Sequence, residues 1–128
     1  MHEADGKWFW WGSKTSAETL KLYNIMYDRI TNKHQINNLI WIWSSPSAEW
    51  YPGNSKVDMI GYDSYPGSYN YDCRKSMYLS LRNIVNARKM VHLTENGPIP
   101  DINTCWQEGA LWGYFLSWSD LVFSQNSD

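Results

Sequence analysis

Apolar side chains recur at helical spacing in two stretches of the chain. The first stretch covers residues 16–33, and Thr15 and Glu18 form a capping box at its start, with a hydroxyl at the N-cap and a carboxylate three residues on. The second stretch follows Asp72, which we expect to cap it, and ends near Arg88. These two stretches predict the principal helices of the molecule.

Four short runs are apolar nearly throughout, which is the pattern of strands that are buried on both faces. They cover residues 39–43, 57–62, 90–94 and 111–118, and a further short helix is expected over residues 106–108. Helical segments separate several of these runs, so we expect a parallel sheet and an α/β fold. In such folds the functional side chains gather at the carboxyl ends of the strands.

Polar side chains stand where the predicted strands end. They are Ser44 and Ser45, residues 63–65, Glu95 and Asn96, and residues 118–120. Glu95 follows its strand directly, which puts a carboxylate at the mouth of the sheet. Catalysis, a helix cap and a loop ion pair all remain open for it at this point.

The composition is rich in aromatic residues, with 9 Trp and 9 Tyr among 128 residues. Many of these rings adjoin Gly, Asp, Ser or Pro, and a flat ring with one polar edge suits the C–H face of a sugar. A large aromatic core is the competing explanation. We expect core packing for Trp10, Trp11, Trp41, Trp43 and Trp112. Trp50 could be either a sugar platform or a loop anchor.

Charge and length exclude several classes of protein. The formal net charge of -2 gives no reason to expect nucleic acid or an anionic membrane as a partner. No apolar run approaches the ~20 residues of a membrane span, and residues 1–5 lack the features of a signal peptide. Cys73 and Cys105 could pair or remain free thiols, and no Cys or His spacing predicts a metal site.

Several blocks of the chain resemble glycoside hydrolase family 26, in the same order as in that family. The most specific block is residues 2–12, which is similar to the acid/base motif; residues 38–43, 50–53, 57–65 and 94–97 are similar to later blocks. The resemblance implies a truncated (β/α)8 TIM barrel, covering about the end of strand 4 to strand 8. Residues 1–128 would be the C-terminal part of one catalytic domain, since a complete barrel needs about 250 residues.

The family consists mostly of retaining endo-β-1,4-mannanases, and the resemblance implies a role for individual residues. Glu3 would be the general acid/base and Glu95 the nucleophile. The residues expected to bind substrate are His2, Trp8, Asp63, Tyr65 and Trp118. Tyr65 would bond the nucleophile and Trp118 would form the floor of the site. A structural hydrogen bond at the strand end is an equal alternative for Asp63.

The resemblance also implies a β-mannan or related polysaccharide as the partner, no cofactor, and a secreted or cell-surface protein that is a monomer at full length. The same mechanism on mixed-linkage β-glucan or β-1,3-xylan stays open, as does a non-catalytic carbohydrate-binding protein. Helices between the strands argue against the latter, because such modules are usually antiparallel sandwiches. We expect the 128-residue chain alone to have little or no activity, because half of the barrel wall would be missing.

Overall fold

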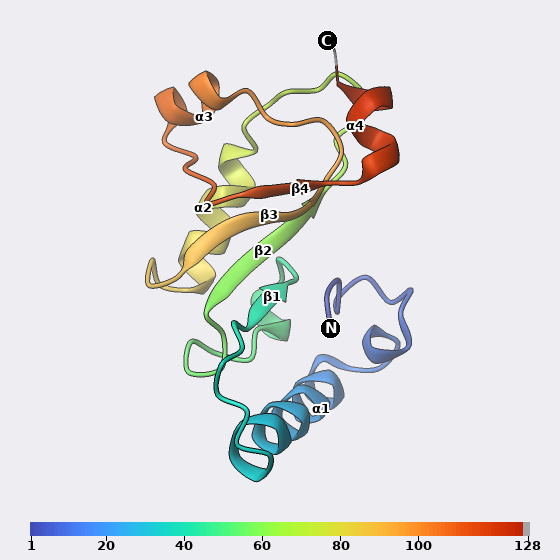
Figure 1. Cartoon of the computed structure of the whole chain (residues 1–128), viewed down its shortest axis with the longest axis vertical. Coiled ribbons are helices and arrows are strands. Elements are labelled where there is room, and N and C mark those ends of the chain that lie inside the picture. The colour runs from blue at the N-terminus through green and yellow to red at the C-terminus, as the bar shows by residue number, and fades with distance from the viewer. Residues whose placement is uncertain (127–128) are drawn as a thin grey trace.

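A four-stranded parallel sheet organises the computed structural model, which describes residues 1–126 (Figure 1). The strands are β1 (Ile42–Ser44), β2 (Met59–Ser64), β3 (Met90–Asn96) and β4 (Phe115–Ser117), and they neighbour one another in chain order. Every neighbouring pair is parallel, as the sequence predicted. The carboxyl ends of all four strands therefore lie at the same edge of the sheet.

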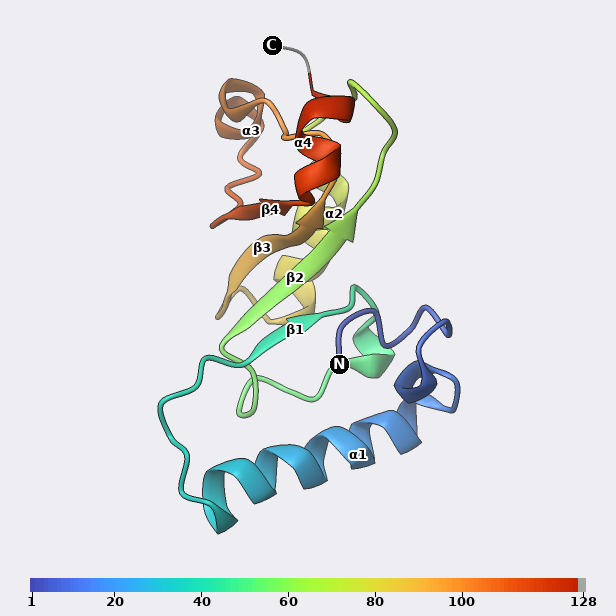
Figure 2. The same cartoon turned by 45° about the vertical axis from the view of Figure 1, so that its right-hand side comes forward.

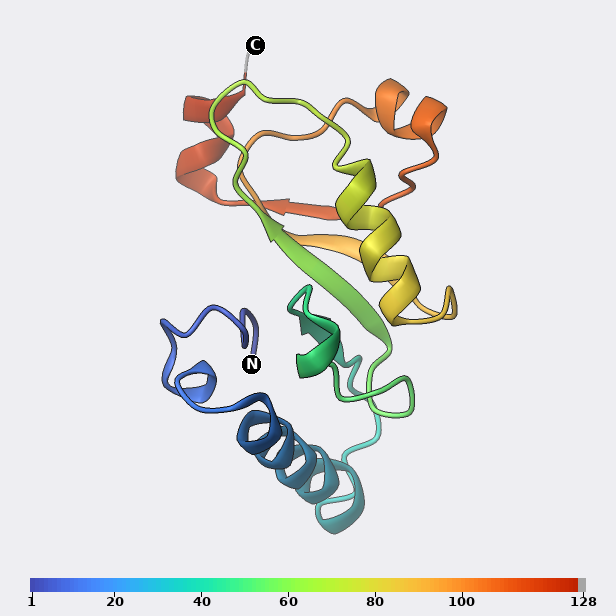
Figure 3. The ribbon, with the colours of Figure 1, turned by 180° about the vertical axis from the view of Figure 1, so that it is seen from behind.

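Helices pack beyond the β1 edge of the sheet (Figure 2) and on its back (Figure 3). They are α1 (Ser16–Asp28), α2 (Lys75–Ile84), α3 (Ile102–Glu108) and α4 (Ser119–Gln125), with short turns η1 (Trp10–Gly12), η2 (Arg29–Lys33) and η3 (Ala48–Trp50). Helix α1 lies below the β1 end of the sheet (Figure 2), and α2 crosses the back of the sheet (Figure 3). No helix within residues 1–126 is both long and apolar enough to cross a membrane.

The main core fills the space between these helices and the back of the sheet. Successive side chains of a strand point to opposite faces, so only alternate residues reach this core. Trp43 and Ile60 do so from β1 and β2, and there they join Tyr23 of α1 and Leu81 of α2 in one buried cluster. Ser44, the residue after Trp43, faces the opposite side of the sheet and bonds Asp63 there.

The first predicted helix is confirmed, including its cap. The backbone N–H of Glu18 donates to Thr15 Oγ1 at 3.3 Å, and that of Thr15 donates to Glu18 Oε2 at 3.1 Å. The helix continues from α1 into η2, a wider π-helical turn that ends at Lys33. The predicted span of residues 16–33 is therefore helical throughout.

The second helix begins and ends differently from the prediction. Asp72 does not cap it; Arg74, with φ 54°, is the N-cap residue, and its backbone N–H donates to Asp72 Oδ1 at 2.7 Å. The Asp72 carboxylate thus fixes the turn ahead of the helix. The helix also stops at Ile84, short of the predicted end near Arg88, because residues 85–87 form a turn.

Helix α3 is longer than the predicted span of residues 106–108. Asp101 caps it early, with Oδ1 accepting from both the N–H and the hydroxyl of Thr104 at 2.7 Å. Helix α4 was not predicted, because its residues had no clear helical period. For α3, the pair Asp101 and Thr104 was a capping signal in the sequence that could have predicted its true start.

The first and last strands are shorter than predicted. β1 begins at Ile42 because Trp41 is bonded to the turn that leads into β2, where its N–H donates to Asp58 Oδ2 at 2.8 Å. β4 covers only residues 115–117 of the predicted 111–118. In that segment the N–H of Gly113 and the carbonyl of Tyr114 still bond β3, so the chain follows the sheet without forming a regular strand.

The tryptophan predictions hold with one exception. Trp43 is buried, and Trp11, Trp41 and Trp112 pack against the core from partly buried positions. Trp10 was wrongly placed in the core, since 69% of it is exposed. Its neighbour Trp11 takes the inward position in the η1 turn, with its ring edge-on to that of Trp10. Trp50 is 8% exposed, which agrees with a loop anchor.

Candidate active site

Glu95 projects from the carboxyl end of β3, between β2 and β4. Neighbouring residues of a regular strand face opposite sides, yet Thr94 donates to Asp63 and Glu95 accepts from Tyr65, both at the carboxyl ends of the strands. The pairing of β2 with β3 shifts between Tyr62 and Asp63, and that of β3 with β4 shifts between Leu93 and Asn96. These irregularities allow two consecutive side chains to reach the same site.

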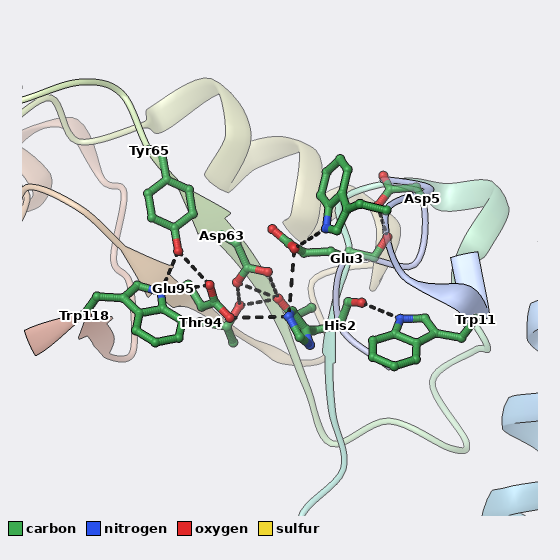
Figure 4. Close-up of polar contacts among 12 residues, drawn as sticks. His2, Glu3, Asp5, Trp11, Asp63, Tyr65, Thr94, Glu95 and Trp118 are labelled. Atoms are coloured by element: carbon green, nitrogen blue, oxygen red, sulfur yellow. Dashed lines mark hydrogen bonds and ion pairs between the residues drawn. The ribbon is translucent and has the colours of Figure 1, made fainter. Parts of the chain in front are cut away.

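Three aromatic side chains surround the Glu95 carboxylate (Figure 4). The Tyr65 hydroxyl donates to Oε2 at 2.6 Å, and Trp118 Nε1 donates to the same oxygen at 3.1 Å and to the Tyr65 hydroxyl at 2.8 Å. His2 Nε2 lies 3.5 Å from the other oxygen, Oε1. Glu95 Oε2 is therefore anchored by two donors, while Oε1 is directed toward the N-terminal segment.

Glu3 reaches the same place from that N-terminal segment. Its N–H donates to the carbonyl of Ser44, at the end of β1, at 2.6 Å, and its φ of 48° is in the left-handed region that non-glycine residues seldom adopt. Trp8 Nε1 donates to Glu3 Oε2 at 2.7 Å, and His2 Nε2 lies 3.9 Å from the same oxygen. One backbone bond thus positions Glu3 beside the sheet.

Three carboxylates converge at the strand ends. Glu3, Asp63 and Glu95 each offer an oxygen within 4.8 Å of the others. On distance alone they could hold a cation. Asp63, however, is already occupied by hydroxyl donors, and His2 lies against both glutamates. The absence of a cofactor stays a prediction.

Asp63 ties three strands together at their ends. Ser44 Oγ lies 2.8 Å from both of its oxygens, and Thr94 Oγ1 donates to Oδ1 at 2.7 Å. Burial raises the pKa of Asp63, and the two hydroxyl donors oppose that shift. These contacts favour the structural alternative for Asp63, although it also lines the pocket described below.

The Tyr65 hydroxyl remains a hydrogen-bond donor over the whole neutral range. Burial raises its pKa above the ordinary value of 10.0, and donation to Glu95 raises it further. Since the phenol keeps its proton at neutral and mildly alkaline pH, it continues to donate to Glu95 Oε2 over that range. Tyr65 is thus suited to orient the carboxylate.

A pocket of about 540 Å³ opens beside Glu3, at the carboxyl ends of β1 and β2. Its lining consists of Glu3, Asp5, Gly6, Trp8, Ser44, Pro46, Tyr62, Asp63 and Tyr65. Sequence reasoning missed Asp5, which accepts a hydrogen bond from Ser45 Oγ at 2.6 Å. Its position two residues after Glu3 was the available signal.

Every site residue predicted from the sequence lies in or beside this pocket. Glu3, Trp8, Asp63 and Tyr65 line it, whereas Glu95, His2 and Trp118 form the adjoining cluster around the second glutamate. Trp8 and Trp118 are 66% and 54% exposed, so both rings are accessible to a ligand. The roles of the individual residues stay predictions.

Comparison with known proteins decides the family. The model of glycosyl hydrolase family 26 matches residues 1–127. The chain belongs to this family. It is 38% identical over 130 residues to a mannan endo-1,4-beta-mannosidase of Thermothelomyces thermophilus, in a match that covers 100% of this chain and 26% of the relative. This family 26 chain thus spans about a quarter of that relative's length.

Solved mannanase structures superpose on the chain closely. The Podospora anserina GH26-CBM35 beta-(1,4)-mannanase gives a TM-score of 0.91 at 34% identity, over 98% of this chain and 28% of that one. A beta-mannanase from a symbiotic protist of the termite Reticulitermes speratus, complexed with gluco-manno-oligosaccharide, gives 0.83 at 35% identity, over 91% and 36%. The predicted fold, part of a (β/α)8 barrel, is thereby confirmed.

Proposed function

We propose that this chain is the C-terminal part of the catalytic barrel of a retaining endo-β-1,4-mannanase. The observation that carries the proposal is the pair Glu3 and Glu95, which offer oxygens within 4.8 Å of each other at the strand ends. Retaining glycosidases hold their two carboxyl groups about 5–5.5 Å apart, and inverting ones about 6.5–9.5 Å apart. The spacing supports the retaining mechanism.

In the first step Glu95 attacks the anomeric carbon, the glycosidic C–O bond breaks, and Glu3 gives its proton to the leaving oxygen. In the second step Glu3 takes a proton from water, whose oxygen displaces Glu95 from the anomeric carbon. Tyr65 and Trp118 hold Oε2 of Glu95, so we assign the attack to Oε1. The products are two sugar chains with configuration retained at the new end.

The substrate we propose is β-mannan or glucomannan. The Thermothelomyces thermophilus relative is named a mannan endo-1,4-beta-mannosidase, and the termite-protist relative was solved with a gluco-manno-oligosaccharide. The exposed rings of Trp8 and Trp118 flank the two glutamates and offer faces for sugar rings. Because such a polymer is extracellular, the proposal includes a secreted or cell-surface location.

The mechanism can be tested in a grafted enzyme, defined as the Thermothelomyces thermophilus relative with this chain in place of its matching segment. Mannan hydrolysis is measured for the grafted enzyme and for its Glu3→Ala and Glu95→Ala variants. Each variant is expected to lose nearly all activity, whereas Glu49→Ala, an exposed carboxylate outside the site, keeps it. Full activity in either site variant would refute the assignment.

The choice of sugar has its own test. The grafted enzyme is expected to act faster on mannan than on lichenan or β-1,3-xylan, and a reversed order would replace the substrate while keeping the mechanism. A carbohydrate-binding protein without catalysis is less compatible with the parallel sheet, because such modules are usually antiparallel. Mannan binding that survives loss of both glutamates, with no hydrolysis by the unaltered protein, would favour it.

A further inference from the structure

Two free cysteines share a buried cluster away from the glutamates. Cys73 is 1% exposed and Cys105 is 9% exposed, and with Ala110 they form an apolar cluster against which Tyr78 and Trp112 pack. Cys73 lies in the connection from β2 to α2, and Cys105 lies in α3, which follows β3. The two thiols therefore come from neighbouring βα connections of the barrel.

Two hydrogen bonds, one from a side chain and one from the backbone, join these two connections. Trp112, which follows α3, donates through Nε1 to the carbonyl of Cys73 at 2.8 Å. The N–H of Asp101, the N-cap of α3, donates to the carbonyl of Tyr71 at 3.0 Å. The segment that contains Cys73 is thus bonded to the residues on both sides of α3, which contains Cys105.

We propose that Cys73 and Cys105 form an intramolecular disulfide when the protein meets a disulfide donor such as oxidised glutathione. Cys105 lines a cavity of about 360 Å³, together with Ile102 and Trp106, whose side chains are exposed, so it is the thiol that the donor reaches first. Cys73 is covered and acts second. The site takes a small disulfide as its co-reactant.

The exchange balances in two steps. The Cys105 thiolate attacks one sulfur of oxidised glutathione, which forms a mixed disulfide and releases one glutathione thiolate. The Cys73 thiolate then attacks the Cys105 sulfur, forms the protein disulfide and releases the second glutathione. The protein loses two protons and two electrons, and the donor is reduced to two thiols.

The surroundings of the two thiols affect how fast the disulfide forms and leave room for the Cys73 proton to be lost. Burial raises the pKa of both thiols, and the Cys73 charge raises that of Cys105 further, so pairing is slow at neutral pH and accelerates as pH rises. Cys73 Sγ donates to Glu108 Oε2 at 3.1 Å. Glu108 is exposed, so its carboxylate returns to water when the thiol proton is lost.

The link would tie the connection that follows Tyr65 to the helix that follows Glu95. It closes a loop of about 30 residues, and loss of chain entropy in the unfolded state then stabilises the folded one. We expect a Tm increase of about 10 °C on oxidation. The increase vanishes on reduction.

The test treats the full chain at pH 8 with oxidised glutathione, blocks the remaining thiols with an alkylating agent and identifies the digested peptides by mass. We expect one linked pair of peptides, containing Cys73 and Cys105, and the Tm increase. Cys73→Ser and Cys105→Ser are the matched controls, each expected to yield at most one glutathione adduct and no Tm increase. Two alkylated thiols in the unaltered chain, or links between separate copies, would overturn the proposal.

Discussion

The two glutamates of the site are held by different kinds of structure. Glu95 stands on β3, paired on both sides by β2 and β4, and its carboxylate receives two hydrogen bonds from aromatic donors. Glu3 stands in an irregular segment with a positive φ, one backbone bond to Ser44, and one donor, Trp8, that is largely exposed. A sheet positions one carboxylate, and a loop positions the other.

This difference matches the proposed roles. A nucleophile must attack one carbon from a fixed direction, which a strand end provides. An acid/base must serve two different oxygens in succession, the leaving group and then water, which a less constrained side chain can do. We therefore expect substitutions around Glu95 to cost more activity than equivalent substitutions around Glu3. In each activity experiment the substitution is made in the grafted enzyme.

The largest effects should come from the glutamates themselves and should differ with the leaving group. Glu95→Ala removes the nucleophile, so it should abolish hydrolysis of both mannan and an aryl mannoside with an acidic phenol. Glu3→Ala should lower mannan hydrolysis by about 10²–10⁴-fold but leave the first step on the aryl mannoside nearly intact, since that phenol needs no proton. Burst kinetics measure that step, and equal losses for both substrates in Glu3→Ala would contradict its role.

The next largest effect is expected at Tyr65. Tyr65→Phe removes the 2.6 Å donor to Glu95 Oε2, and a hydrogen bond to a charged group is worth about 1.5–3 kcal/mol, so kcat/KM should fall by about 10- to 100-fold. Tyr69→Phe is the matched control, because Tyr69 is 59% exposed and lies outside the pocket lining. An unchanged rate in Tyr65→Phe would mean that the strand end and the Trp118 donor orient Glu95 without the Tyr65 hydroxyl.

A smaller effect is expected at Trp8. Trp8→Phe removes the donor to Glu3 Oε2, but this side chain is 66% exposed and water can replace it, so a loss of about fivefold is expected. Trp10→Phe, at a ring that is 69% exposed and donates no hydrogen bond to Glu3, should leave the rate unchanged. If Trp8→Phe lost more activity than Tyr65→Phe, the surroundings of Glu3 would matter more than those of Glu95, contrary to expectation.

The smallest effect concerns stability at the centre of the sheet. His92 is buried and stacks on Tyr114, with the two ring centroids 4.1 Å apart. Neither nitrogen of the His92 ring has a hydrogen-bond partner within residues 1–126. Burial lowers its pKa below 6.5, so the unfolded chain binds a proton at a higher pH than the folded one does. The free energy of unfolding should therefore fall as pH drops below 6.5, until the folded pKa is passed.

Urea unfolding of the 128-residue chain at a series of pH values measures this slope. His92→Phe keeps a ring against Tyr114 and should flatten the acid side of the profile. His34→Gln, at an exposed histidine, should leave the profile unchanged. A profile in His92→Phe that matches the unaltered chain would show that another group causes the slope.

The sequence predicted the sheet side of the molecule better than the loop side. The strand that carries Glu95 was readable because a strand buried on both faces is apolar throughout, and the period changes clearly between strand and helix. Glu3 had no such local signal. Its position depends on a positive φ and on the carbonyl of Ser44, a contact between residues far apart in the chain.

Element ends were predicted less well, for a related reason. Asp72 and Asp101 are both acidic residues ahead of a helix, yet only Asp101 is an N-cap, because Asp72 bonds the N–H of Arg74 in a turn instead. β4 is short because only part of the apolar run 111–118 pairs regularly with β3. The first choice depends on a local turn and the second on pairing between strands, and the spacing of apolar residues encodes neither.

In the proposed mechanism Glu95 forms the covalent intermediate while Glu3 transfers the proton. The most direct test incubates the grafted enzyme with a 2-deoxy-2-fluoro-mannoside that carries a good leaving group, and then locates the bound sugar by peptide mass. We expect one sugar, on the peptide that contains Glu95, and none in Glu95→Ala. A sugar on Glu3, or hydrolysis of mannan with inverted configuration, would contradict it.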